Sequence, residues 1–437
     1  MARGWLFPWA MGSVAFGGAS LLVPLYVVEL GGGPLELGIL ASVAAFVGVP
    51  GAILFGRWAD QHGRRRPYVI GSLILTTAML AVIPFTESVP VVLFANGLIW
   101  FSFAAAMPVL TLLAVDGEPA HSWSTRIALL NKYQGWGWAI GLLFGSVWTA
   151  ILGVTLGALE AIQTFFIAMA ILGGIGVVIG VRTFPVDGVE IKPVSGIQLR
   201  RAIVRASPFN VRTVTFPFTV ARFDITQVNP RRFIQRFTPT LGLYFLAIIL
   251  VFSGFSAFFA PLPAFLTDIG FTSGEIFGLY LASSIASAVC FGLVGKLASK
   301  GNVAVFQAAG LLVRGLAFPA VALVGVSLGT GFVGLGTLAG VFVIVGITWA
   351  VITVTAGTLV TALTPIAIRG EALGVYAAMT ALAGGFGAII GGYLGAISFL
   401  LGFTVAGGLI LIGAGIVYSL RRVSGSISTD ALESEKL

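Results

Sequence analysis

The sequence is poor in charge, cysteine and histidine. Only 9% of its 437 residues are Asp, Glu, Lys or Arg, whereas soluble domains contain about 25%. The single cysteine, Cys290, excludes an intramolecular disulfide, a redox pair and a cysteine metal cluster, and two histidines in connecting segments argue against a histidine-built metal site. Nucleotide-binding loops and nucleophile constellations are also missing. We therefore expect no metal, no cofactor and no enzymatic activity.

Apolar residues are abundant instead, at 58% of the chain, and the mean hydropathy is +1.05. A helix needs about 20 mainly apolar residues to span a bilayer. We count twelve such runs, at roughly 5–29, 35–56, 67–86, 89–114, 127–154, 158–181, 241–267, 274–298, 303–325, 330–362, 370–395 and 398–420. The pattern predicts an all-α polytopic membrane protein.

Charges in the connections between these runs separate by sign. One set contains Arg57, Arg126, Arg369 and the basic 182–240 segment; the other contains Glu29, Glu36, Glu87, Glu160, Asp268 and Glu275. Basic connections stay in the cytoplasm. We expect a multi-pass protein of the plasma membrane with both termini cytoplasmic. The net charge of +8 follows from this topology, so we expect no nucleic-acid partner.

The chain contains an internal duplication. At a shift of 239 residues, Pro24 aligns with Pro263, Glu29 with Asp268, Gly31 with Gly270, Glu36 with Glu275 and Gly56 with Gly295. A second match joins 125–133 to 368–376. We expect a six-helix bundle over 1–182, a basic cytoplasmic linker over 183–240, a second six-helix bundle over 241–422 and a disordered cytoplasmic tail over 423–437.

The linker mixes arginine with apolar residues at 196–207 and at 229–237, as interfacial helices do. Basic residues near a membrane surface are attracted to anionic lipids. We expect contacts with anionic lipids through residues 196–237.

The stretch GRWADQHGRRRP (56–67) resembles the signature of the major facilitator superfamily, G-x-x-x-D-x-x-G-R-[RK], between the second and third helices. Gly56, Asp60, Gly63, Arg64 and Arg65 occupy its positions. With twelve helices and the duplication, the resemblance covers almost the whole chain. It implies two six-helix bundles related by pseudo-twofold symmetry, and a monomeric transporter that moves a small molecule by alternating access.

The resemblance also implies a gate built from Gly56, Asp60, Gly63, Arg64 and Arg369. Gly56 and Gly63 suit a tight turn. Asp60 would latch the closed cytoplasmic side against the start of the eleventh helix near Arg369, where the helix dipole favours an anion. The alternative for the arginines is a purely topological role, which we favour for Arg65 and Arg66.

Glycines recur one turn apart in two of the expected helices: Gly137, Gly141 and Gly145 in 135–146, and Gly387 and Gly391 in 384–395. Small residues at this spacing let membrane helices approach closely, so we predict helix packing. The first set is similar to the G-x-x-x-G-P-x-x-G-G pattern of drug antiporters in the superfamily. Leu142 replaces its proline and Ser146 its last glycine.

In the superfamily the first, fourth, seventh and tenth helices line the central cavity. Polar and aromatic residues on these helices and the fifth are our candidates for the substrate cavity: Asn96, Trp100, Asn131, Gln134, Trp138, Phe255, Phe259, Trp349 and Thr353. For each, the alternative is packing against neighbouring helices. Arg314 maps near the middle of the membrane, where a charge is a functional candidate; it has either a structural partner or an anionic substrate.

Aromatics, amides and hydroxyls without a carboxylate at mid-membrane suit neutral or amphipathic molecules. We predict a secondary transporter that exports an amphipathic or drug-like compound. An uptake permease or facilitator for a small nutrient is the alternative, and a non-transporting receptor on the same fold is a third.

Overall fold

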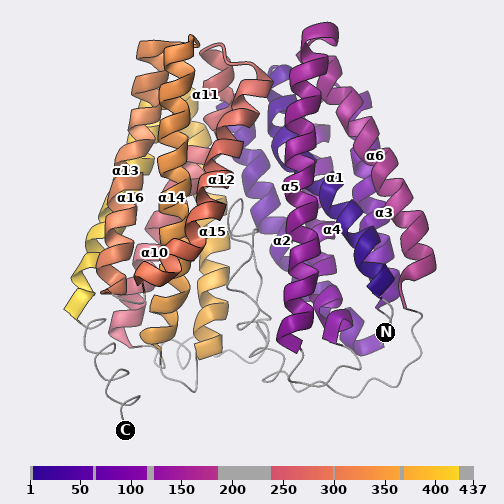
Figure 1. The fold of residues 1–437 in the computed structure, drawn as a ribbon, viewed down its shortest axis with the longest axis horizontal. Coiled ribbons are helices and arrows are strands. Elements are labelled where there is room, and N and C mark those ends of the chain that lie inside the picture. Colours follow the sequence, from indigo (N-terminus) through magenta and orange to yellow (C-terminus); the bar gives the residue numbers. More distant parts are fainter. Residues whose placement is uncertain are drawn as a thin grey trace. The chain divides into compact units, whose positions relative to one another are not determined.

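The computed structural model of the chain consists of helices (Figure 1) and describes residues 3–62, 65–115, 123–185, 238–298, 301–364 and 369–422. No strand occurs in these ranges. The long helices are α1 (Leu6–Glu29), α2 (Pro34–His62), α3 (Arg66–Val82), α4 (Val89–Val115), α5 (Trp123–Leu156), α6 (Ala158–Thr183), α10 (Pro239–Phe259), α12 (Ser273–Ala298), α13 (Val303–Leu328), α14 (Phe332–Ala362), α15 (Arg369–Ile397) and α16 (Phe399–Ser419). Short turns of helix are η1 (Arg3–Trp5), η2 (Ile83–Phe85) and α11 (Leu262–Asp268).

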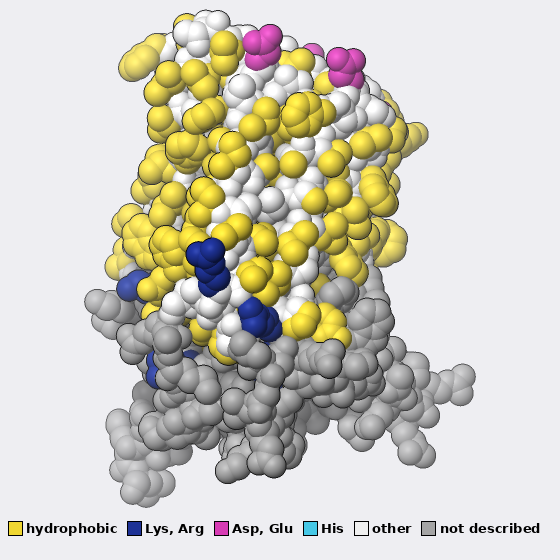
Figure 2. Space-filling view, turned by 90° about the vertical axis from the view of Figure 1, so that its right-hand side faces the viewer, with side chains coloured by type: hydrophobic (Ala, Val, Ile, Leu, Met, Phe, Trp, Pro, Cys, Tyr) yellow, Lys and Arg dark blue, Asp and Glu magenta, His cyan; other side chains and the backbone are white. Residues whose placement is uncertain are grey.

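Most of these helices are long and apolar enough to cross a bilayer. Eleven spans meet this criterion within the described ranges, and α2 contributes a shorter apolar helix over Pro34–Gly48. One face of the molecule shows a broad hydrophobic band with acidic side chains at one end and basic side chains toward the other (Figure 2). The predicted all-α polytopic membrane fold is confirmed.

The helix expected over 241–267 is broken. α10 ends at Phe259, and α11 begins at Leu262 after Pro261. Proline has no N–H to donate to the carbonyl of Ala257, and its ring crowds that carbonyl, so the helical ladder is interrupted. The backbone resumes with Phe265 N donating to Pro261 O at 3.1 Å.

The turn expected over 56–67 is shorter than predicted. Gly56 to His62 belong to α2, and α3 begins at Arg66. The interpretation of Gly56 as a turn residue is therefore wrong. The polar residues after Gly56 have adequate helix propensity, and a helix can extend into water once it has crossed the bilayer. Gly63 and Arg64 lie outside the described residues.

The described helices form two compact units. The first contains α1 to α6 together with residues 271–281, which include the start of α12. The second contains α10, α11, the rest of α12 and α13 to α16. The predicted boundaries at 182, 240 and 422 stay a prediction.

The aligned residues of the duplication adopt the same local structure. Gly31 and Gly270 both have positive φ, at 84° and 94°, a conformation that glycine tolerates best. Each donates its N–H to the carbonyl three residues earlier at 2.9 Å. Glu36 then accepts from Gly33 N, and Glu275 accepts from Thr272 N, both at 2.9 Å. These two glutamates therefore cap the starts of α2 and α12.

Helix pairing repeats in the same order. In the first unit α1 packs on α5 and α6, and α3 packs on α4 and α6. In the second unit α10 packs on α15 and α16, and α13 packs on α14 and α16. Each unit is thus organised around one helix, α1 or α10, that is covered on two sides.

Glycines bring α5 onto α1 and α15 onto α10. A Cβ at Gly137 would lie 2.6 Å from Ala10 O, and a Cβ at Gly141 would meet Val14 O. Gly145 is looser, because a Cβ there would lie 3.4 Å from Leu22 Cδ1. In the second unit, Cβ atoms at Gly387 and Gly391 would meet the carbonyls of Ser253 and Ala257. These close approaches support the helix-packing prediction.

Candidate functional site

The first unit contains an aromatic cluster built from three helices. α1 contributes Trp9 and Phe16, α4 contributes Trp100 and Phe103, and α5 contributes Trp138. Phe16 stacks on Phe103 with ring centroids 3.9 Å apart, and the ring of Trp9 stacks on Phe103 at 5.0 Å. Trp100 and Trp138 approach Phe16 edge-on, at 4.9 and 5.0 Å. We call these five residues the N-terminal aromatic cluster.

Several buried polar atoms on the helices of this cluster have no hydrogen-bond partner among the described residues. The side chain of Gln134 lies one turn before Trp138 and is 2% exposed, yet neither its Oε1 nor its Nε2 has a hydrogen-bond partner. The indole Nε1 atoms of Trp9 and Trp138 are also buried without an acceptor. Each unmet buried group costs about 1–3 kcal/mol. Such groups in a native protein call for an explanation, and a ligand that satisfies them when it binds is one.

The two predicted asparagines lie on the helices that build this cluster. Asn96 is buried on α4, one turn before Trp100. Asn131 is half-buried on α5, three residues before Gln134. Neither asparagine takes part in the ring contacts themselves, so their place in a substrate cavity stays a prediction.

A second aromatic cluster lies in the other unit. Phe255 on α10 has Trp349 of α14 at 5.8 Å and Phe318 of α13 at 6.3 Å between ring centroids. Phe259, one turn further along α10, approaches Phe318 at 5.9 Å. Phe255 and Trp349 are buried and Phe259 is half-buried. We call Phe255, Phe259, Phe318 and Trp349 the C-terminal aromatic cluster.

The guanidinium of Arg314 lies inside this second cluster. Its Cζ is 4.4 Å from the ring centroid of Phe255, 5.2 Å from that of Trp349, 5.5 Å from that of Phe318 and 5.6 Å from that of Phe259. The side chain is 2% exposed. Nη1 donates to Val345 O at 3.1 Å, and Nε has no partner in the described part of the chain. Cation–π attraction therefore stabilises a charge that has one hydrogen-bond acceptor.

Most threonine hydroxyls of α14 form a hydrogen bond within their own helix. Thr348, Thr355, Thr358 and Thr361 each donate to a carbonyl three or four residues earlier in the helix. This back-bonding is common in membrane helices and needs no ligand. Thr353 differs, because its buried Oγ1 has no partner. It lies one turn after Trp349, whose Nε1 is also buried without an acceptor.

Comparison with known proteins agrees with this arrangement. A family model described as Major Facilitator Superfamily matches residues 9–355. The chain belongs to this superfamily. It is therefore a transporter embedded in a membrane by many apolar helices, and its substrate is a small molecule.

Solved structures share the superfamily fold. The nucleoside transporter NupG is 16% identical, with a TM-score of 0.62 over 98% of this chain and 99% of that one. A variant of the peptide transporter POT bound to sulfate is 16% identical, with a TM-score of 0.68 over 97% and 94%. A bacterial homologue of the human lysosomal transporter Spinster, inward-facing and unoccupied, is 14% identical, with a TM-score of 0.64 over 98% and 96%. No curated protein matches the sequence significantly.

The structure gives the backbone positions of some residues of the predicted gate. Asp60 lies in the last turn of α2, and Arg369 is the first residue of α15. Their side chains, like Gly63 and Arg64, lie outside the described part of the structure. Arg65 is buried before α3, and Arg66 donates from Nη2 to the carbonyl of Val181 in α6. Arg66 thus ties α3 to α6, in addition to the topological role expected for it.

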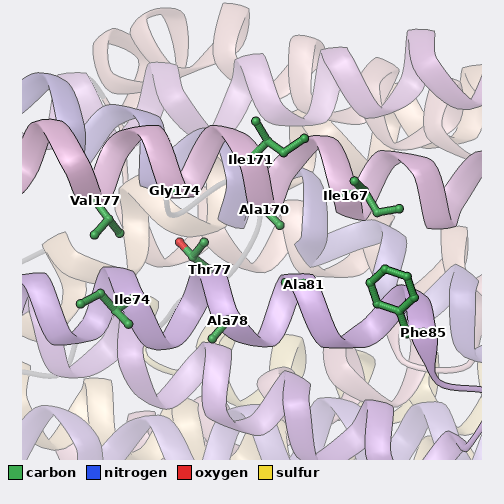
Figure 3. Close-up of a pocket in the computed structure, with 10 residues that line it drawn as sticks. All are labelled: Ile74, Thr77, Ala78, Ala81, Phe85, Ile167, Ala170, Ile171, Gly174 and Val177. Atoms are coloured by element: carbon green, nitrogen blue, oxygen red, sulfur yellow. The ribbon is translucent and has the colours of Figure 1, made fainter.

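A surface groove of about 490 Å³ lies between α3 and α6 (Figure 3). Its walls are apolar and include Ile74, Ala78 and Phe85 of the α3 side and Ile167 and Ile171 of α6. Several of these side chains are largely exposed, Phe85 to 80%. A hydrophobic groove on exposed helices of a membrane protein faces lipid, so we do not count it as part of the substrate site.

Some residues of the clusters were not predicted from the sequence. They are Trp9, Phe16 and Phe103 in the first unit and Phe318 in the second. Trp9 and Phe16 are seven residues apart on α1, and Phe103 follows Trp100 by three, so each pair shares a helix face. Because these helices are apolar all round, the spacing does not mark that face as the one that meets protein. Among the described residues, no group of three or more His, Cys, Asp or Glu side chains could hold a metal ion.

Proposed function

We propose that this superfamily member exports a small amphipathic, drug-like molecule by alternating access. The main observation behind this proposal is the N-terminal aromatic cluster, together with the buried amide of Gln134, which lies one turn before Trp138 on α5 and has no partner among the described residues. Aromatic rings supply a large apolar surface, and a few placed polar groups orient a ligand, which is the usual composition of small-molecule sites. Both units carry such a cluster, each with a buried indole N–H that has no acceptor.

The charge distribution supports an orientation in the plasma membrane with both termini cytoplasmic, because basic connections are retained inside. The glycine spacing of α5 is similar to the pattern of drug antiporters in the superfamily, apart from its two replaced positions. The structural neighbours named above include transporters of nucleosides and of peptides, which are small polar or amphipathic molecules. We further propose that the protein acts as a monomer and that residues 196–237 contact anionic lipids.

Uptake of a nutrient is the second candidate. Leu142 and Ser146 replace the proline and the last glycine of the antiporter pattern, which favours a permease or facilitator. A receptor that does not transport is a third, and the gate signature of residues 56–65 argues against it, since a protein that never alternates has less use for a latch.

Transport is tested by reconstitution into liposomes that contain a pH-sensitive dye, with protein-free liposomes as the control. Members of a panel of amphipathic compounds and nutrients are added one at a time, and uptake is followed by mass spectrometry. Export coupled to protons predicts a dye response that depends on an amphipathic compound. Nutrient flux without a proton signal would favour the facilitator instead, and no flux for any compound would contradict transport of these classes.

A further inference from the structure

Arg314 is a buried charge that the proposed function does not use. It lies on α13, and each of its four ring neighbours comes from α10, α13 or α14. A cation taken out of water at this depth needs compensation, because desolvation of an ion costs several kcal/mol. Rings supply part of that compensation through their quadrupoles.

The guanidinium of Arg314 has more hydrogen-bond donors than acceptors around it. A guanidinium has five N–H donors in a planar fork. One of them reaches Val345 O, and the same carbonyl also accepts from Thr348 Oγ1 at 2.9 Å. Nε is buried and has no partner. A guanidinium normally binds a carboxylate through two parallel N–H···O hydrogen bonds. In Arg314, N–H groups that could form such bonds have no acceptor among the described residues.

Two further buried polar atoms without partners among the described residues lie on α14, which also carries Trp349 of the cluster. Trp349 Nε1 and Thr353 Oγ1 are buried without partners, one turn apart on α14. Thr353 and Phe259 are each half-buried, one turn beyond Trp349 on α14 and one turn beyond Phe255 on α10. A planar aromatic molecule bound at the cluster would meet aromatic rings, an indole N–H donor and a cation.

We propose that the C-terminal aromatic cluster binds an organic anion that carries an aromatic ring. The anionic group pairs with the guanidinium fork of Arg314, and the ring packs against Phe255 and Trp349. This inference rests on the proposed function and narrows its substrate class, from amphipathic molecules in general to aromatic carboxylates and sulfonates. A neutral molecule of the same shape would leave the guanidinium donors unpaired and bind more weakly.

Binding is tested on the purified full chain in a neutral detergent with two probes, 2-naphthoate and its uncharged isostere 2-naphthamide. Quenching of tryptophan fluorescence reports binding, because Trp349 lies in the cluster. We expect 2-naphthoate to bind at least about 10-fold more tightly than 2-naphthamide, since a charge-assisted bond in a buried site has this effect. Arg314→Met should abolish the preference, and Arg314→Lys, which keeps the charge without the fork, should retain part of it.

Tyr244→Phe is the matched control. Tyr244 OH donates to Gln307 Oε1 at 3.1 Å, so this variant removes a different polar contact between α10 and α13 and leaves the cluster intact. It should keep the preference for 2-naphthoate. Equal binding of the two probes by the unmodified protein, an unchanged preference in Arg314→Met, or the same loss in Tyr244→Phe would each overturn the proposal.

Liposome flux separates this inference from the proposed function. If neutral amphipathic compounds are transported while 2-naphthoate shows no preferred binding, the anion site is wrong and transport stands. If 2-naphthoate binds through Arg314 while no compound of the panel crosses the membrane, the binding site stands and the proposed function fails.

Discussion

Some buried residues of this transporter carry polar groups that have no hydrogen-bond partner among the described residues. Replacing such a group with an apolar one should raise the stability of the fold and lower transport. Gln134 is the clearest case, since both polar atoms of its amide are buried and unpaired. Such a residue weakens the fold, and natural proteins tolerate this cost chiefly at functional sites. Sequence reasoning located the amide on the fifth span, but only the structure distinguishes an amide that is satisfied from one that is not.

Gln134→Leu should therefore stabilise the protein and impair transport. Removing an unsatisfied buried amide relieves a cost of about 1–3 kcal/mol, and leucine has a similar volume. The melting temperature is read from tryptophan fluorescence and the transport rate from liposomes. Gln307→Leu is the control, because Gln307 is buried but accepts from Tyr244, whose hydroxyl would lose its acceptor. A melting temperature of Gln134→Leu that does not exceed that of Gln307→Leu would show the amide to be structural.

The positions of whole helices were easier to predict from the sequence than the side of each helix that packs against protein. Hydropathy located nearly all of the spans, and repeated turn residues such as Gly31 and Gly270 revealed the duplication, because these signals depend on local chemistry. The break at Pro261 was missed although proline is its cause, since an apolar run continues on both sides. Faces could not be predicted because helices in lipid are apolar all round, so the pattern does not mark which side meets protein. That is why Trp9 and Phe318 escaped notice.

Glycines at the α1–α5 and α10–α15 contacts should not tolerate a methyl group. Gly141→Ala and Gly391→Ala place a Cβ against a backbone carbonyl that cannot move aside, and overpacking of this kind costs about 1–3 kcal/mol. Gly153 and Gly357 lie in α5 and α14 with open space at the Cβ position. Alanine at either control should gain up to about 1 kcal/mol from helix propensity. Melting temperatures that rise in all four variants would contradict close packing at these helix pairs.

At the scale of the whole molecule, the function depends on two units that are similar in construction but differ in chemistry. The helix pairing of the two units corresponds, and so do the capping glutamates of the two halves of the sequence, as expected from a duplication. Their clusters differ, since the first offers an amide and the second a cation among rings. The gate signature is complete only in the first half of the sequence. The aligned stretch GKLASKGN (295–302) is a weaker counterpart that is still basic. A duplicated scaffold thus carries two clusters that differ in their polar groups.

The gate is where we expect the two halves to act together, and Asp60 is the residue to test. Asp60→Asn should preserve insertion and melting temperature while it lowers transport at least about 10-fold, because loss of a charge-assisted hydrogen bond has that effect on the latched state. Glu160→Gln is the control, an exposed carboxylate in the first turn of α6 that should leave transport unchanged. The pairing itself is examined by exchange: Asp60→Arg combined with Arg369→Asp should recover transport that each single variant loses. Full transport by Asp60→Asn, or no recovery in the exchanged pair, would show that this aspartate does not latch onto α15.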